Sequence, residues 1–556
     1  MFDKNIEFID NLALKRRLMR ISPIESKMGI SYCVTPSNDY VLLKNDIPAD
    51  DLNNPREAVK KNLKNNIKSE MKSNDFIINF GIGLGYLLDE TFNTYPSKIL
   101  IYEPDLNLLH FVLHNVDISE HLSSGRVFIT NDLDELINKL STSFLSKDKV
   151  EIVYLQNYAT LKNQELLLLT QRVYDTCKSK IVDINTITRF SKQWLNNSLD
   201  NIKFIKEKSA YLLSDLENKF AGQTALILAP GPSLKDNIEK VKENRNKFVI
   251  FAVNKVAKYL AENNIIPDFL VCLDAGNMDW TLSGLDNYLA QVNCIMDIRS
   301  DKSLFSKNFK KIFINFSETD FLMKKMQKYN DMIKPYEIGG TAASLALVSA
   351  IKMGFSKIVL SGLDLAFKDG LIYSYGEMMN RISPEQIIVD KIKKNIVQVK
   401  SVNGRMVSTR EDYEAFIYHF ASLIKELEYS EIYNTTSFGA MIPGVKTANF
   451  DDLIPTSNSS TNQLDFVEPF NLKLEDFMQD EFLNINNIIS KISKNVFSPE
   501  LISSIIKSAL IYEYMQAKIL IVLQKNFDEE LAENFITETK NSIKFIVEKL
   551  QTSKLI

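Results

Sequence analysis

The segment that decides the fold of this chain reads Thr224-Ala-Leu-Ile-Leu-Ala-Pro-Gly-Pro-Ser-Leu-Lys-Asp236. Its apolar first half predicts a buried β-strand over 224–228, and the polar residues after Leu234 predict a helix. Gly231 allows a tight turn and a close approach to a ligand, and Ser233 can cap the helix. A strand, a glycine turn and a helix N-terminus together present N–H groups and a positive dipole end to phosphate. The spacing matches neither standard nucleotide loop, so an ordinary strand-to-helix turn is the alternative interpretation.

A second glycine turn and a series of polar strand ends extend this pattern. Gly339, Gly340 and Thr341 precede the helical run 345–354, and the next predicted strand ends at Asp364. Two further predicted strands end at Asn254 and Asp274. The carboxyl ends of parallel strands form the edge where ligands bind in open α/β sheets. We therefore expect a site for phosphate and sugar at this edge.

The central region, 215–445, alternates predicted strands and helices, which favours a Rossmann-like parallel sheet with helices on both faces. The expected strands are 224–228, 248–253, 269–273, 292–296, 311–316 and 357–363. After Asp364 the pattern breaks into a long polar excursion, and such an excursion beyond a strand end usually carries function.

These motifs resemble the motility accessory factor (Maf) family of bacterial flagellin glycosyltransferases. The resemblance rests on 226–274 and 339–364, and it continues through Val402-Asn-Gly404 and the element 434–444. The central domain of that family is similar to bacterial sialyltransferases, in which such motifs shape a site for a CMP-sugar. The resemblance also extends to an upstream α/β module, so it covers most of the chain.

The resemblance implies a glycosyltransferase that moves a nonulosonic acid, of the pseudaminic or legionaminic type, from its CMP form to Ser or Thr of flagellin. The reaction would be an inverting displacement at the anomeric carbon. The implied substrate-binding residues are Gly231, Pro232, Ser233, Asn254, Asp274, Gly339, Gly340, Thr341 and Tyr373. The candidates for the catalytic base are Asp364, Glu377 and His419. Related proteins often carry a histidine in the excursion after Asp364, where this chain has Tyr373-Ser-Tyr375 instead, so the choice of base stays open.

We expect that no cofactor is required, and the sequence does not indicate a metal ion, although one is possible. Metal-dependent sugar transferases use paired carboxylates to hold Mg²⁺ or Mn²⁺ on a diphosphate leaving group. The pairs Asp50-Asp51 and Asp451-Asp452 lie outside the sugar-site motifs. A CMP donor leaves as a monophosphate, which has less need of a metal.

The N-terminal part, 1–200, predicts a second Rossmann-like α/β module followed by a helical connector. Its glycine turn, Gly81-Ile-Gly-Leu-Gly85, is followed by a strand that ends at Glu103. This layout resembles the first two motifs of an S-adenosylmethionine methyltransferase. Glycines also serve close packing of a helix on a strand, and we favour that interpretation.

Composition agrees with a globular protein of about three domains. The chain has 556 residues, 45% of them hydrophobic, and a formal net charge of −4, so no basic excess favours nucleic acid. The four cysteines show no metal-binding spacing. No signal peptide or membrane-spanning run is evident, and we expect a cytoplasmic protein. Beyond a polar linker, 465–556 predicts a C-terminal helical domain with stretches at about 473–494, 498–525 and 528–551.

Three other functions remain open. The glycine motifs also look like those of archaeal pterin pyrophosphokinases, which use ATP and Mg²⁺. A non-catalytic flagellin-binding assembly factor with a degenerate sugar site is the second alternative. A methyltransferase that uses Gly81 to Glu103 is the third. The sequence does not identify the sugar, the acceptor sites or the oligomeric state.

Overall fold

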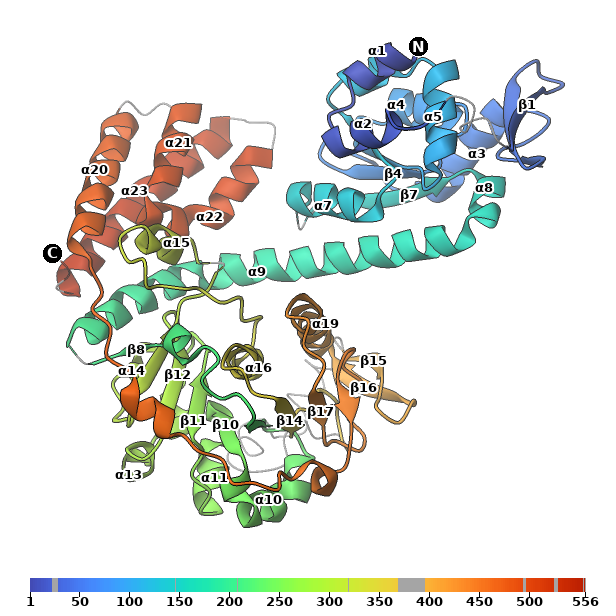
Figure 1. The fold of residues 1–556 in the computed structure, drawn as a ribbon. Coiled ribbons are helices and arrows are strands. Elements are labelled where there is room, and N and C mark those ends of the chain that lie inside the picture. The colour runs from blue at the N-terminus through green and yellow to red at the C-terminus, as the bar shows by residue number, and fades with distance from the viewer. Residues whose placement is uncertain are drawn as a thin grey trace. The chain divides into compact units, whose positions relative to one another are not determined.

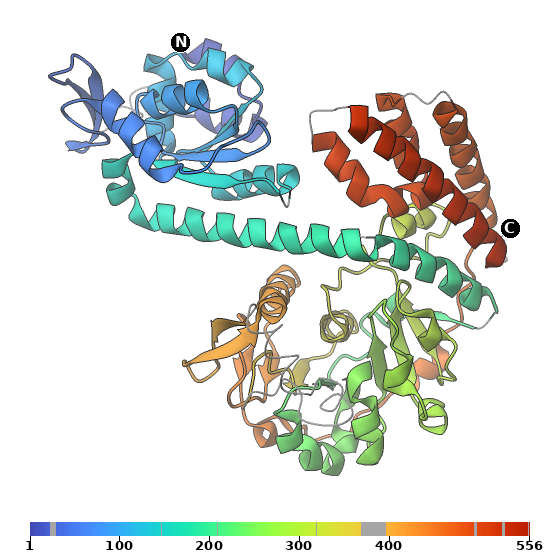
Figure 2. The same ribbon diagram turned by 180° about the vertical axis from the view of Figure 1, so that it is seen from behind.

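The protein is described from a computed structural model, which covers residues 1–22, 29–145, 147–207, 209–318, 320–368, 396–493, 497–524, 529–553 and 555. Two compact units divide most of the chain, the first over Met1–Thr188 and the second over Arg189–Ile519 and Asp528–Ile556. Each unit has its own parallel sheet (Figures 1 and 2). Within the described ranges, no helix is long and apolar enough to span a bilayer.

The first unit contains a four-stranded sheet in the order β6-β5-β4-β7, in which neighbouring strands run parallel. Its strands are β4 (Phe76–Phe80), β5 (Lys98–Tyr102), β6 (Val127–Thr130) and β7 (Val150–Tyr154). A small antiparallel sheet joins β1 (Ile30–Val34), β2 (Tyr40–Lys44) and β3 (Ile47–Pro48). The helices are α1 (Phe2–Glu7), α2 (Leu12–Leu18), α3 (Pro55–Asn66), α4 (Tyr86–Thr94), α5 (Leu106–Asn115), α6 (Ser119–Ser123), α7 (Leu133–Ser143), α8 (Gln156–Leu161) and α9 (Asn163–Glu207), of which α9 continues into the second unit. The predicted Rossmann-like module is confirmed.

The glycine turn after β4 is filled by side chains of the unit itself. One oxygen of the buried Glu103 carboxylate accepts from the Ile82 N–H (3.1 Å), and the other accepts from the Asp105 N–H (2.9 Å) and the Tyr158 hydroxyl. A Cβ on Gly81 would lie 2.6 Å from the ring of Tyr158. Packing therefore explains both the glycine and the acidic strand end without a ligand.

The second unit is built on a nine-stranded sheet in the order β18-β17-β14-β9-β10-β11-β12-β13-β8, in which neighbouring strands run parallel. Its strands are β8 (Tyr211–Leu212), β9 (Thr224–Leu228), β10 (Val249–Val253), β11 (Phe269–Cys272), β12 (Asn293–Asp297), β13 (Ile312–Asn315), β14 (Lys357–Ser361), β17 (Ile432–Asn434) and β18 (Lys446–Thr447). Strands β15 (Ile396–Lys400) and β16 (Met406–Arg410) form a separate hairpin. All six predicted central strands are confirmed to within two residues at each end.

Helices cover this sheet, and a helical bundle follows it. The larger ones are α10 (Leu234–Glu243), α16 (Ala342–Lys352) and α19 (Glu411–Glu426); the shorter ones are α11 (Ala257–Glu262), α12 (Asp279–Leu282), α13 (Asp286–Leu289), α14 (Lys302–Phe305) and α15 (Phe321–Gln327). The bundle contains α20 (Glu475–Ile492), α21 (Pro499–Lys507), α22 (Ala509–Gln524) and α23 (Glu529–Thr552) (Figure 1). The α/β sheet with a C-terminal helical part agrees with the predicted fold class.

The predicted helix 498–525 is wrong in one respect, because Ser508 divides it into α21 and α22. The buried carboxylate of Glu481 accepts from the Ser508 hydroxyl (2.8 Å) and from the N–H groups of Ala509 (2.8 Å) and Leu510 (3.1 Å). Those N–H groups belong to the first turn of α22, which has no partners within its own helix. Glu481 thus supplies from another helix the cap that a break requires.

At the carboxyl end of β12, helix α9 covers the edge of the large sheet. Asn201 of α9 donates to the carbonyls of Ile298 (2.8 Å) and Ser300 (2.9 Å), just beyond β12. In the same segment, the Nε–H of Arg299 donates to Asp297 (3.0 Å), and Nε lies 4.0 Å from a carboxylate oxygen of Asp320.

A third carboxyl group reaches the same cluster from α22. Glu513 is only 3% exposed. Burial, and then the charge of Asp320, raise the pKa of Glu513 far above its usual range. One guanidinium cannot balance three buried carboxylates, so Glu513 holds a proton at neutral pH.

Replacing Gly81 tests the packing explanation of the N-terminal turn. We expect Gly81→Ala to lower the free energy of unfolding by about 2–4 kcal/mol, since it adds a clash with Tyr158 to the cost of a positive φ (+85°). Gly125→Ala is the matched control, because Gly125 has φ +71° and open space around it, and we expect about 1 kcal/mol. The clash component should disappear in a Tyr158→Ala background. Equal costs for Gly81→Ala in both backgrounds, measured by calorimetry, would contradict this account.

The Glu513 cluster predicts that the second unit loses stability as pH rises. A carboxyl group whose pKa is raised to about 8 in the folded state stabilises that state below its unfolded pKa, and this contribution is lost as pH rises toward 8. We expect the free energy of unfolding to fall by up to about 1.4 kcal/mol per pH unit between about pH 5 and 8. Glu513→Gln should reduce this slope, whereas the exposed Glu475→Gln should not. Urea unfolding followed by tryptophan fluorescence measures it, because both tryptophans, Trp194 and Trp280, lie in this unit. Parallel slopes for wild type and Glu513→Gln would refute the assignment.

Candidate functional site

The candidate site lies at the carboxyl edge of the nine-stranded sheet, where the order of the strands reverses. From β9 the chain adds β10, β11, β12 and β13 on one side, and β14 then pairs with β9 on the other side. Such a reversal opens a crevice between the loops that follow the two strands, and ligands bind there. The loop after β9 carries Gly231 to Ser233, and the loop after β14 carries Asp364. Both were predicted to belong to the site.

Backbone contacts lock these two loops together. The Gly231 N–H donates to the Gly362 carbonyl (2.7 Å), and a Cβ on Gly231 would lie 2.4 Å from that oxygen. Gly362 has φ +77°, and a Cβ there would lie 2.0 Å from the Ala229 carbonyl. Both glycines are therefore required by the approach of one loop to the other.

Asp364 joins the loops through its side chain. It is 1% exposed, and it accepts from the Ser233 N–H (2.8 Å) and the Ser233 hydroxyl (2.5 Å). Burial raises the pKa of this carboxyl, and the hydrogen bonds from Ser233 and from the side chain of Thr436 oppose that rise. These contacts favour a positioning role for Asp364 over the predicted role of a base.

The same contacts change what the first loop can offer a phosphate. Pro230 and Pro232 have no N–H, and the N–H groups of Gly231 and Ser233 are already paired. The Ser233 hydroxyl does not cap α10, because it donates to Asp364 instead. In this arrangement, donors for a phosphate must come from neighbouring elements.

The second glycine turn supplies such an element. Helix α16 runs back along the sheet to β14, so its N-terminus lies at the carboxyl edge. Thr341 caps it, accepting from the Ser344 N–H (3.0 Å) in a capping box. Gly339 takes φ +60°, and Gly340 is exposed. The first turn of this helix has N–H groups without partners inside the helix, and they favour an anion.

Helix α19 lies beside this turn and carries His419. A Cβ on Gly340 would lie 3.8 Å from the Phe416 ring, and one on Gly339 would lie 3.1 Å from Leu423. His419 is partly buried, one turn beyond Phe416. The other candidates in the excursion, Tyr373, Tyr375 and Glu377, lie outside the described residues.

The ends of β10 and β11 add polar groups. Asn254 is buried, and its amide donates to the Thr281 hydroxyl (3.3 Å), while its oxygen has no partner among the described atoms. Lys255 lies 3.6 Å from Asp274, with side chains 27% and 42% exposed. Lys255 is not among the predicted site residues, although its place directly after a strand-end asparagine is a usable signal.

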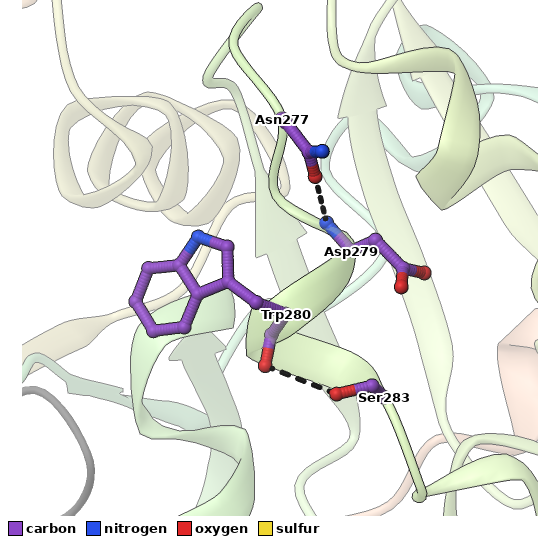
Figure 3. Close-up of a pocket in the computed structure, with 4 residues that line it drawn as sticks. All are labelled: Asn277, Asp279, Trp280 and Ser283. Carbon is purple, nitrogen blue, oxygen red and sulfur yellow. Dashed lines mark hydrogen bonds between the residues drawn. The ribbon is translucent and has the colours of Figure 1, made fainter.

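A cavity of about 550 Å³ lies beside α12, which follows β11. Its lining residues are Asn277, Asp279, Trp280 and Ser283 (Figure 3). Trp280 is partly exposed and was also missed, because neither its spacing nor its neighbours belong to a recognisable motif.

The segment 434–440, which includes the end of β17, hydrogen-bonds to the backbone of the Asp364 loop. Asn434 donates to the Leu363 carbonyl (3.0 Å), and the Ala440 N–H donates to the Asp364 carbonyl (2.8 Å). A Cβ on Gly439 would lie 2.8 Å from that same oxygen. The predicted motif 434–444 thus fixes the position of the Asp364 loop.

Among the residues that the structure describes, no group of three or more His, Cys, Asp or Glu side chains is placed to hold a metal ion.

Comparisons with known proteins agree with this architecture. The family described as 6-hydroxymethylpterin diphosphokinase MptE-like matches residues 196–370, the part that carries both glycine turns. An uncharacterized protein of Treponema pallidum (strain Nichols) is 29% identical over 92 residues, which are 16% of this chain and 42% of that protein. This chain therefore spans less than half the length of that curated relative.

A solved structure, the MAf glycosyltransferase from Magnetospirillum magneticum AMB-1, matches with a TM-score of 0.65. The match covers 100% of this chain and 95% of that one at 14% sequence identity. The resemblance to the Maf family is thus confirmed at the level of the fold, and the chain has the fold of a MAf glycosyltransferase along its whole length.

Proposed function

We propose that this protein is a glycosyltransferase that moves a nonulosonic acid from a CMP donor to Ser or Thr of flagellin. The observation that carries the proposal is the location of the glycine turns, Asn254 and Asp274 on one sheet edge in a chain with the fold of a glycosyltransferase. The sugar and the acceptor in this proposal are those of the Maf family, which the sequence motifs resemble.

In this proposal the residues have distinct roles. The N-terminus of α16, at Gly340 and Thr341, binds the phosphate of CMP, since its N–H groups and dipole suit an anion and stabilise the leaving group. Asp364 and Ser233 hold the adjoining loop in place. His419 is then the candidate for the base that accepts the proton of the acceptor hydroxyl, because Asp364 is given a positioning role and Glu377 lies outside the described residues.

A pyrophosphokinase is the second candidate, because the matched family is described as a pterin diphosphokinase and covers residues 196–370. It would use ATP with Mg²⁺ in place of a CMP-sugar. Ligand binding separates the two candidates.

We expect CMP to stabilise the protein in a thermal-shift assay, by about 2.7 kcal/mol at 100 times its Kd. UDP, ATP with Mg²⁺ and S-adenosylmethionine serve as comparisons. CMP should shift the melting temperature of wild type more than any of them, and the shift should shrink in Asn254→Ala. Stabilisation by ATP with Mg²⁺ alone would favour the pyrophosphokinase, and no shift with any nucleotide would favour a non-catalytic binding factor.

Asp364→Asn tests whether this carboxylate positions the loop or acts as the base. We expect a loss of about 1–3 kcal/mol of stability together with weaker CMP binding, because an amide nitrogen would face the donors of Ser233. The exposed Asp236→Asn is the matched control and should change neither. If Asp364→Asn instead binds CMP and melts as wild type does, while kcat falls at least about 100-fold, Asp364 is the base.

A further inference from the structure

Helix α12 is held in place from several directions, although it is only one turn long. The Met278 N–H before it donates to Asp301 (2.7 Å), and Asp279 pairs with Lys307 (2.5 Å). The Thr281 hydroxyl accepts a hydrogen bond from the side-chain amide of Asn254 (3.3 Å) and donates to the Met278 carbonyl (2.7 Å). The position of the intervening Trp280 is therefore set by the scaffold.

The indole of Trp280 is partly exposed and lines the cavity beside α12. Figure 3 shows it leaving α12 on the side opposite to the Asp279 carboxylate. Its neighbour Thr281 is bonded to Asn254, at the end of β10. A partly exposed aromatic ring on a helix that is bonded to a polar strand end suits the wall of a site for a ring-shaped ligand.

Lys255 follows Asn254 directly, and it is only loosely paired. Its ammonium lies 3.6 Å from Asp274, which is longer than a direct charge-assisted hydrogen bond. A ligand carboxylate can compete for this cation, and Asp274 can then accept from ligand hydroxyls. The ends of β9 and β11 are two strand spacings apart, about 10 Å, a span that a nucleotide carrying one sugar can cover.

Resting on the proposed function, we propose that Trp280 and Lys255 form the subsite for the transferred sugar. The indole packs against the apolar face of the sugar ring, and the ammonium pairs with the carboxylate that distinguishes a nonulosonic acid from a neutral hexose. Lys255 thereby selects an anionic sugar, and Trp280 orients its ring.

Fluorescence tests the contact with Trp280, because the chain has only two tryptophans. Trp194 lies 4.9 Å from the guanidinium of Arg299 in the closed part of the edge, and Trp194→Phe keeps an aromatic ring there. In the Trp194→Phe protein, CMP-N-acetylneuraminic, CMP-pseudaminic or CMP-legionaminic acid should cause a saturable decrease in emission that CMP alone does not cause. The Trp280→Phe protein should show no such decrease.

Titration calorimetry with matched lysine variants tests the charge. We expect Lys255→Met to weaken binding of the best CMP-sugar about tenfold while changing the Kd for CMP by less than about twofold. Lys242→Met, in the exposed last turn of α10, is the control and should leave both Kd values unchanged.

The outcomes separate this subsite from the proposed function. If a CMP-sugar binds but the emission of Trp280 does not change and Lys255→Met binds as wild type does, the subsite is wrong and the proposed function stands. An equal decrease with CMP alone would place the base on the indole and overturn the subsite. If neither CMP nor any CMP-sugar binds, both proposals fail.

Discussion

The carboxylate of Asp364 is the interaction on which the candidate site depends. It takes two hydrogen bonds from Ser233 and so ties the loop after β14 to the loop after β9, across the point where the order of the strands reverses. Buried carboxylates are stable only when donors surround them. The glycines at 231, 362 and 439 follow from this contact, because each allows the backbone to approach closely enough for it to form.

This arrangement divides the sheet edge into two parts with different uses. Beyond β12 and β13 the edge is covered by α9 and by the cluster around Arg299, so that part is core. Around β9, β10 and β14, exposed or half-exposed groups such as Gly340 and Lys255 remain. A rigid, closed half next to an open half is a suitable support for a site that must hold a ligand in a fixed geometry.

Much of the fold could be predicted from the sequence, since its strands are short apolar runs bounded by glycine or polar residues. The strand 224–228 and its neighbours came from that pattern. The break at Ser508 could not, because the carboxylate that causes it belongs to Glu481, a residue 27 positions away. The bonds from Gly231 to Gly362 and from Ser233 to Asp364 could not be predicted either. A glycine required by a ligand and a glycine required by another loop look the same in a sequence. Trp280 and Lys255 carry no motif, and only the folded chain shows where they lie.

The protonated Glu513 gives the second unit a thermodynamic property that its contacts alone do not show. A group that holds a proton in the folded chain and releases it on unfolding couples folding to proton exchange with the buffer. The heat of unfolding near neutral pH will therefore contain the ionisation enthalpy of whichever buffer takes up that proton. Calorimetric enthalpies for this protein will differ between phosphate and amine buffers even where the melting temperatures agree.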